Sequence, residues 1–96
     1  MFYNQLVEKA NEIIETENWT FDSAVKEIAA EELQEVSRIN SEDLEIEGDV
    51  IGLVYELYNG QYLVVVNSPD LDESFHCLRY DDACAKATER VFELSN

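Results

Sequence analysis

The residues best suited to chemistry are one histidine and two cysteines near the C-terminal end of the chain. His76 and Cys77 are adjacent, and Cys84 follows. A cysteine nucleophile needs its histidine base within hydrogen-bond reach, but neighbours in a strand, which we expect SFHCL to form, point to opposite faces. The same three side chains supply at most three zinc ligands, without the spacing of a zinc finger. We therefore predict no catalytic residue, no metal site and no cofactor.

Two short acidic segments could instead attract a cation. PDLDE lacks the DxDxDG pattern and distant glutamate of an EF-hand, so we interpret it as a solvated turn. SEDLEIEGD is denser in carboxylates and contains no Lys or Arg, but without a rigid cage it would hold Mg²⁺ only non-specifically. The chain also lacks GxGxxG, GxxxxGK[ST], HExxH and GxSxG motifs. These observations predict a protein that is not an enzyme.

A third acidic group lies on a predicted helix. Glu27, Glu31 and Glu35 recur every four residues, which on a helix gives a row of like charges about 6 Å apart. Like charges at this spacing destabilise a helix, so helix stability does not explain the row. Because SEDLEIEGD follows this helix closely, we expect the row and the segment to form one continuous negative surface.

Three helices are predicted from apolar residues that recur with helical spacing. They cover residues 2–16, 21–38 and 80–94. Thr20 is the expected N-cap of the second helix, with Trp19 before it able to pack on the first turn. Asp81 or Asp82 lies near the start of the last helix, where negative charge is favoured.

A β-hairpin is predicted around Asn59-Gly60, which separates two strand-like runs. A two-residue turn there would form an apolar core face and leave the other face partly solvated. The pairs expected on the core face are Leu57 with Tyr62, Tyr55 with Val64, and Leu53 with Val66.

The acidic segment cannot continue the buried face of this hairpin. Glu45, Glu47 and Asp49 share the odd numbering of the predicted core positions, so we expect a bulge or break near Gly48 or Gly52. With SFHCL as a third strand, the predicted order is α-α-β-β-β-α. We expect one α+β domain, residues 1–96, in which an antiparallel meander has its helices packed on one face.

This order resembles the double-stranded-RNA-binding domain, which is α-β-β-β-α with an alanine-rich last helix. The resemblance is one of topology. That family binds RNA through a lysine cluster at the start of the last helix, where this chain has Asp81 and Asp82. A shared fold would therefore not imply RNA binding by that route.

The composition of the chain excludes several classes of protein and predicts the charge of its partner. The chain has 96 residues, 22 acidic against 6 basic, a net charge of −16 and a hydrophobic fraction of 46%. Such a chain is too apolar for a disordered tail, and too acidic to bind nucleic acid or anionic membranes without specificity. The N-terminus lacks the pattern of a secretory signal, and the longest apolar run, YLVVVN, is strand-sized. We expect a cytoplasmic protein with reduced thiols and a positively charged partner.

A regular array of carboxylates on a rigid body imitates the phosphates of a nucleic-acid strand, which are about 3.4 Å apart. In size, charge and the acidic stretches EVSRINSEDLEIEGD and VKEIAAEELQE, the chain resembles the small DNA-mimic inhibitors of phages and mobile elements. The resemblance implies an anti-CRISPR or anti-restriction inhibitor that occupies the DNA-binding groove of a host defence complex. The expected partner-binding residues are Glu27, Glu31, Glu35, Glu42, Asp43, Glu45, Glu47, Asp49, Asp70, Asp72 and Glu73.

Two other functions fit the same composition. One is an immunity or antitoxin-type inhibitor of a basic nuclease toxin, which would use a few anchors such as Tyr58 and Trp19. Tyr55 and Tyr62 are expected in the core instead. The other is a small acidic adaptor or virion component, whose charge serves solubility alone.

Overall fold

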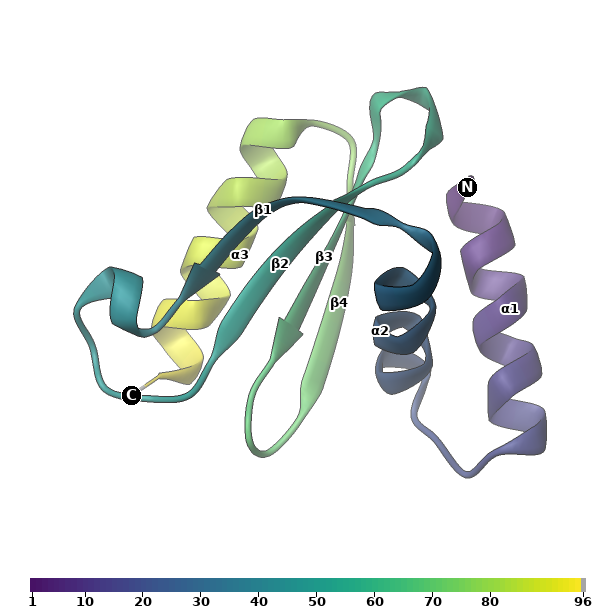
Figure 1. Ribbon diagram of the computed structural model, residues 1–96, viewed down its shortest axis with the longest axis horizontal. Helices are drawn as coiled ribbons and strands as arrows, with labels where there is room; N and C mark the ends of the chain where they lie inside the picture. The colour runs from purple at the N-terminus through teal and green to yellow at the C-terminus, as the bar shows by residue number, and fades with distance from the viewer. Residues whose placement is uncertain (96) are drawn as a thin grey trace.

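The computed structural model describes residues 1–95, in which a four-stranded antiparallel sheet lies between helices (Figure 1). The sheet order is β1-β2-β3-β4, a simple meander. The α+β class is confirmed, but the order is α-α-β-β-β-β-α, with one strand more than predicted. The elements are α1 (Tyr3–Thr16), α2 (Phe21–Glu32), β1 (Gln34–Asn40), the short 3₁₀ helix η1 (Glu42–Leu44), β2 (Ile51–Glu56), the 3₁₀ turn η2 (Tyr58–Gly60), β3 (Tyr62–Asn67), β4 (Asp72–Cys77) and α3 (Tyr80–Leu94).

The added strand, β1, replaces the end of the predicted second helix. That helix begins as expected, with the Thr20 hydroxyl accepting the Ser23 N–H at 3.1 Å, but it ends at Glu32. The pairing of β1 with β2 shifts by one residue between Glu35 and Ser37, which is a β-bulge. The bulge lets Val36 and Ile39 both pack on the α3 side, although they are three apart. Their spacing therefore imitates a helical face, which is why the sequence pattern predicted helix here.

The hairpin turn lies where Asn59-Gly60 predicted it but is one residue longer. The Leu57 N–H donates to the Gln61 carbonyl at 2.8 Å, and both Asn59 and Gly60 have left-handed φ angles, 67° and 68°. The extra turn residue moves the register by one position, so the three predicted cross-strand pairs are wrong. The observed pairs are Tyr55 with Leu63 and Leu53 with Val65, while Leu57 faces Gln61.

Helices cover both faces of the sheet, rather than the single face predicted. α1 and α2 pack with Tyr55, Leu63 and Val65 on one face, and α3 packs with Val54, Val64 and Val66 on the other. The second face is therefore core and not partly solvated. Burial on both sides explains the uninterrupted apolar run of β3, which differs from the alternation of a strand with one wet face. β4 includes most of the expected third strand, and α3 has the predicted bounds.

Two glycines, Gly48 and Gly52, determine how the chain leads into β2 and how closely β2 packs against α3. The predicted break is at Gly48, whose φ of +142° suits glycine, while the ladder through Gly52 is regular. A Cβ on Gly52 would lie 3.0 Å from Val91 and 3.2 Å from Ala87. The absence of that carbon lets α3 approach the strand closely, which fixes the helix end beside the acidic segment.

Candidate acidic docking surface

The acidic loop, residues 41–49, lies at one end of the sheet beside the C-terminal end of α3 (Figure 1). Its first residue, Ser41, is only 1% exposed and anchors it. The Ser41 Oγ accepts the Val50 N–H at 3.1 Å and lies 2.5 Å from the Ser95 Oγ, just after α3. Leu44 packs on the α3-side core. The loop is therefore attached to the fold at both its β1 and its α3 side.

One of the five carboxylates in the loop has a structural role. Asp43 Oδ2 accepts the Asn40 N–H at 2.9 Å, and the Asp43 N–H donates to Asn40 Oδ1 at the same distance. Glu45, with a left-handed φ of 57°, then ends η1 by donating its N–H to the Glu42 carbonyl at 3.0 Å. Together with the Ile46 N–H, which donates to the Ser41 carbonyl at 3.1 Å, these local hydrogen bonds order the backbone of residues 41–46.

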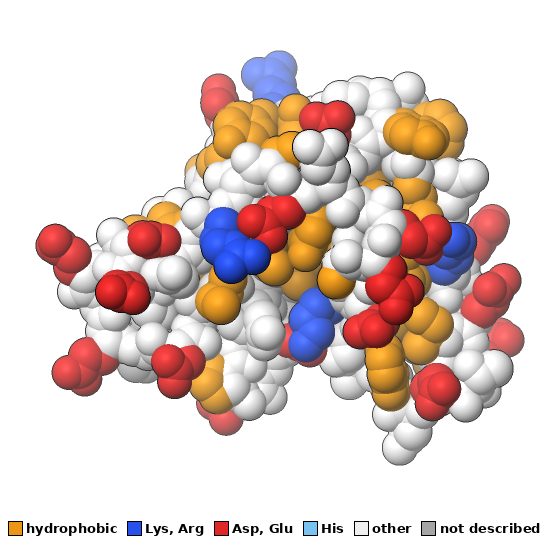
Figure 2. Space-filling view, in the orientation of Figure 1, with side chains coloured by type: hydrophobic (Ala, Val, Ile, Leu, Met, Phe, Trp, Pro, Cys, Tyr) orange, Lys and Arg blue, Asp and Glu red, His pale blue; other side chains and the backbone are white. Residues whose placement is uncertain are grey.

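The other four carboxylates are exposed to solvent. Within residues 1–95 none of them makes an ion pair, and Figure 2 shows acidic side chains at this end of the molecule with no basic side chain among them. The neighbouring C-terminus of α3 adds the negative end of a helix dipole, and its last turn has no basic residue. Neither packing nor local charge balance accounts for these four residues: Glu42, Glu45, Glu47 and Asp49.

The predicted row on the second helix does not form. Glu27 and Glu31 are exposed on α2, but Glu35 lies on β1 with its Oε1 2.9 Å from Arg38 Nη2. That hydrogen bond raises the pKa of the Arg38 guanidinium. α2 also lies at the opposite end of the molecule from the acidic loop, so the two groups are not continuous (Figure 1).

A helical row of carboxylates does occur on α1, which the partner-binding prediction omitted. Its exposed members are Glu8, Glu12 and Glu15, followed by Glu17 just beyond the helix. The signal for this row was the same helical spacing, which the sequence shows on residues 2–16 as clearly as on α2. The molecule thus carries separate acidic surfaces at its two ends.

Two of the three acids predicted around the β3–β4 turn join elements of the fold. Asp72 Oδ2 lies 3.0 Å from Lys26 Nζ and accepts the Ser23 hydroxyl at 3.0 Å, which ties β4 to α2. Glu73 accepts from Arg90 through both carboxylate oxygens, at 2.8 and 2.9 Å, which ties β4 to α3. Of this predicted trio, only Asp70 is exposed and outside an ion pair among residues 1–95.

His76 and Cys77 lie on opposite faces of β4, as expected. His76 stacks on Tyr3 with ring centroids 4.0 Å apart, and its Nε2 lies 2.7 Å from Gln61 Oε1. The side chain is exposed, and the partial desolvation of its ring lowers the pKa of His76. Cys77 packs on the α3 side, where burial and then Asp82 raise the pKa of its thiol. This geometry excludes a Cys-His nucleophile pair between these two residues.

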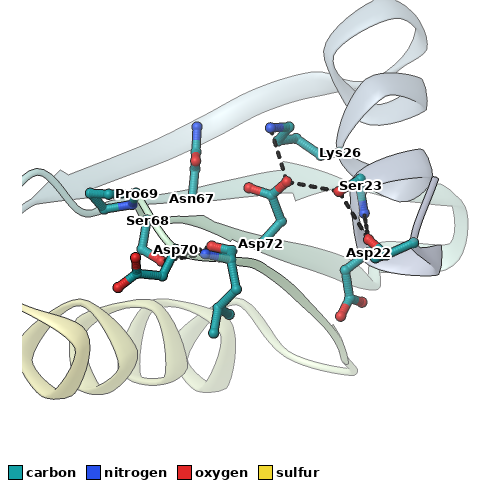
Figure 3. Close-up of a pocket in the computed structure, with 10 residues that line it drawn as sticks. Asp22, Ser23, Lys26, Asn67, Ser68, Pro69, Asp70 and Asp72 are labelled. Atoms are coloured by element: carbon teal, nitrogen blue, oxygen red, sulfur yellow. Dashed lines mark hydrogen bonds and ion pairs between the residues drawn. The ribbon is translucent and has the colours of Figure 1, made fainter. Parts of the chain in front are cut away.

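A cleft beside α2 was not foreseen from the sequence. It comprises adjoining cavities of about 460 and 350 Å³ that share Thr20, Ser23 and Lys26. Figure 3 shows the larger one, with the Lys26–Asp72 ion pair on one side and Asp70 on the β3–β4 turn across from it. Trp19, 41% exposed, lines the smaller cavity. We refer to both cavities together as the α2 cleft.

Comparisons with family models, curated proteins and solved structures give no match for this chain. Among residues 1–95 no helix is both long and apolar enough to cross a membrane. Over the same residues, no three histidine, cysteine or acidic side chains gather as a metal-binding group.

Proposed function

We propose that this protein is a non-enzymatic inhibitor that docks through its acidic loop on the nucleic-acid-binding groove of a host defence complex. It takes the place of the nucleic acid there, in the manner of an anti-CRISPR protein or, next in order, an anti-restriction protein. The observation that carries the proposal is the set of four exposed carboxylates on the acidic loop, none of which makes an ion pair among residues 1–95. The remaining acids on the surface contribute to long-range attraction.

The position of the four carboxylates supports a binding role because it costs stability. They repel one another, and they lie beside the negative end of the α3 dipole, where cations would be stabilising. A basic groove would remove this repulsion on binding. The hydrogen bonds of Ser41 and Asp43 order the first part of the loop, which reduces the conformational entropy lost when it docks.

The distribution of cations supports the same interpretation. Of the six basic residues, five already pair with acids of this chain, and Arg79 is the one outside an ion pair among residues 1–95. None of those pairs includes a carboxylate of the acidic loop, so no ion pair among residues 1–95 neutralises its charges. Opposite charge on a partner would then speed association through electrostatic steering.

A second candidate is an immunity-type inhibitor of a basic nuclease toxin. The observation that favours it is the exposure of two aromatic residues: Trp19 is 41% exposed and Tyr58 is 59% exposed. Such side chains commonly act as the anchors of a small, specific interface. Tyr55, by contrast, is buried, and Tyr62 packs on the core.

Affinity capture from host lysate separates these candidates. The test uses wild-type protein, a loop variant (E42Q/E45Q/E47Q/D49N) and an α1 variant (E8Q/E12Q/E15Q/E17Q). The two variants remove the same number of charges, so they share a net charge and differ only in where the acids are lost. Captured proteins are identified by mass spectrometry after washes at low and at high salt.

We expect wild type and the α1 variant to retain a nucleic-acid-binding complex at low salt, and the loop variant to lose it. High salt should release it from every form, because exposed charges are screened. Capture of one small basic toxin that resists high salt would favour the second candidate. Equal capture by both variants, or clean beads from a lysate known to contain such complexes, would contradict the proposal and favour charge that serves solubility alone.

A further inference from the structure

The α2 cleft is a second feature with the character of a binding site. It is bounded by the start of α2 on one side and by the β3–β4 turn on the other (Figure 3). The larger cavity, about 460 Å³, has the volume of a small-ligand pocket, and the smaller one extends it to Trp19.

Acidic groups dominate the charge of the cleft. Four carboxylates line it against one ammonium, that of Lys26. Two of the four are already engaged: Asp22 accepts the Ser74 hydroxyl at 2.5 Å, and Asp72 pairs with Lys26. The other two, Glu27 on α2 and Asp70 on the turn, are exposed and make no ion pair among residues 1–95. The cleft is therefore complementary to a positively charged ligand. The carboxylates that could pair with this ligand lie on its two walls, Glu27 on α2 and Asp70 on the β3–β4 turn.

Trp19 contributes an aromatic side chain to the same cavity as one of these carboxylates. It lines the smaller cavity together with Glu27. A tryptophan face attracts a cation within about 6 Å of its ring, and a guanidinium stacks on it better than an ammonium does. A carboxylate next to the ring can accept two parallel N–H bonds from the same guanidinium.

We propose that the α2 cleft binds an arginine side chain from an extended basic segment of the partner, with Trp19 as the stacking surface and Glu27 as the carboxylate. Asp70 would meet a second cation of the same segment from the opposite wall. Lys26 does not oppose this, because Asp72 neutralises its ammonium at 3.0 Å. The inference rests on the proposed function, since it gives the basic partner a specific contact that the acidic loop alone lacks.

The test is a fluorescence titration, because Trp19 is the one tryptophan of the chain and reports directly on the cleft. The probe is a capped Gly-Arg-Gly-Arg-Gly peptide, compared with its lysine and citrulline counterparts at the same ionic strength. The proteins are wild type, Glu27→Gln, Asp70→Asn and the loop variant. Circular dichroism checks that each variant keeps its fold.

We expect a saturable change in Trp19 emission with the arginine peptide at millimolar concentration, and binding weaker by about fivefold or more with lysine. Citrulline, which is uncharged, should give no saturation. Glu27→Gln should weaken the arginine peptide by about three- to tenfold, Asp70→Asn by less, and the loop variant should leave it nearly unchanged. Equal binding of arginine and lysine, no saturation, or the same loss in the loop variant as in Glu27→Gln would overturn the inference.

These results remain distinct from those for the proposed function. A negative titration together with lysate capture that depends on the loop would remove the cleft assignment and leave the charge-mimic proposal standing. Saturable arginine binding without any captured partner would do the reverse: the cleft would bind arginine and the proposed inhibitor function would fail.

Discussion

At the scale of single residues, the buried Ser41 hydroxyl anchors the acidic loop. It accepts the Val50 N–H and lies in hydrogen-bond contact with Ser95, so one oxygen joins the start of the loop, the start of β2 and the end of α3. A buried donor that loses its acceptor keeps its full cost of desolvation. The position of the exposed carboxylates therefore depends on a residue that carries no charge.

Ser41→Ala should lower the free energy of unfolding by about 1–3 kcal/mol, because the Val50 N–H would be left without an acceptor. Ser68→Ala is the matched control: its hydroxyl bonds to Leu71 in an exposed turn, where water can replace it. Urea denaturation measures both. Equal small losses in the two variants would show that Ser41 does not anchor the loop.

His76 should make stability depend on pH. Partial desolvation lowers its pKa, so the folded state binds fewer protons than the unfolded chain as the pH falls through the ordinary histidine value, near 6.5. The stability that His76 contributes is therefore present above that value and is lost below it. Between pH 7.5 and 5.5, wild type should lose more stability than His76→Gln, measured by urea denaturation. A parallel response of the two proteins would contradict this.

At the scale of elements, local signals predicted α1, the start of α2, the hairpin turn and α3. Thr20 caps a helix through its own hydroxyl, and Asn-Gly readily adopts the left-handed angles that a tight turn needs, so both signals are local. The strand β1 could not be predicted in this way. Val36 and Ile39 are three residues apart, which is a helical spacing, and the bulge allows both to pack on one face of the strand. Only the pairing with β2 makes this segment a strand.

The candidate site was likewise only partly predictable. The composition of residues 41–49 pointed to the acidic loop, because no cation occurs within it. It could not show that Asp72 and Glu73 are neutralised by Lys26 and Arg90, which are distant in sequence. Nor could it place Trp19 beside a cleft whose other wall is the β3–β4 turn.

Of the six basic residues, we expect Arg90 to contribute most to stability through contacts between elements of the fold. It pairs with Glu73 on β4 and with Glu93 on α3, and its pKa is raised chiefly by the hydrogen bonds to Glu73. Arg90→Gln should cost about 0.5–1.5 kcal/mol of unfolding free energy, because the partly buried Glu73 loses its partner. Lys86→Gln, which removes a 3.8 Å surface pair with Glu89 and a cation–π contact of 5.2 Å with Phe75, should cost less than that. Urea denaturation decides, and similar effects of the two changes would contradict this role.

At the scale of the whole molecule, the net charge of −16 opposes folding through self-repulsion. Five of the six cations are engaged in ion pairs, so most of the acids repel without compensation. Sodium chloride should therefore raise the melting temperature between about 20 and 500 mM, since the Debye length falls from about 20 to 4 Å. The loop variant should start higher and rise less. A melting temperature that falls with salt would mean that the ion pairs outweigh the repulsion.

The most direct test of the central claim is competition for nucleic acid on the captured partner. Fluorescent duplex DNA is bound to the partner, and wild type, the loop variant or the α1 variant is added while anisotropy is followed. We expect wild type and the α1 variant to release the DNA in proportion to their own binding, and the loop variant to release little. A stable complex that holds both the DNA and wild-type protein would contradict charge mimicry, because both ligands could not then occupy one groove.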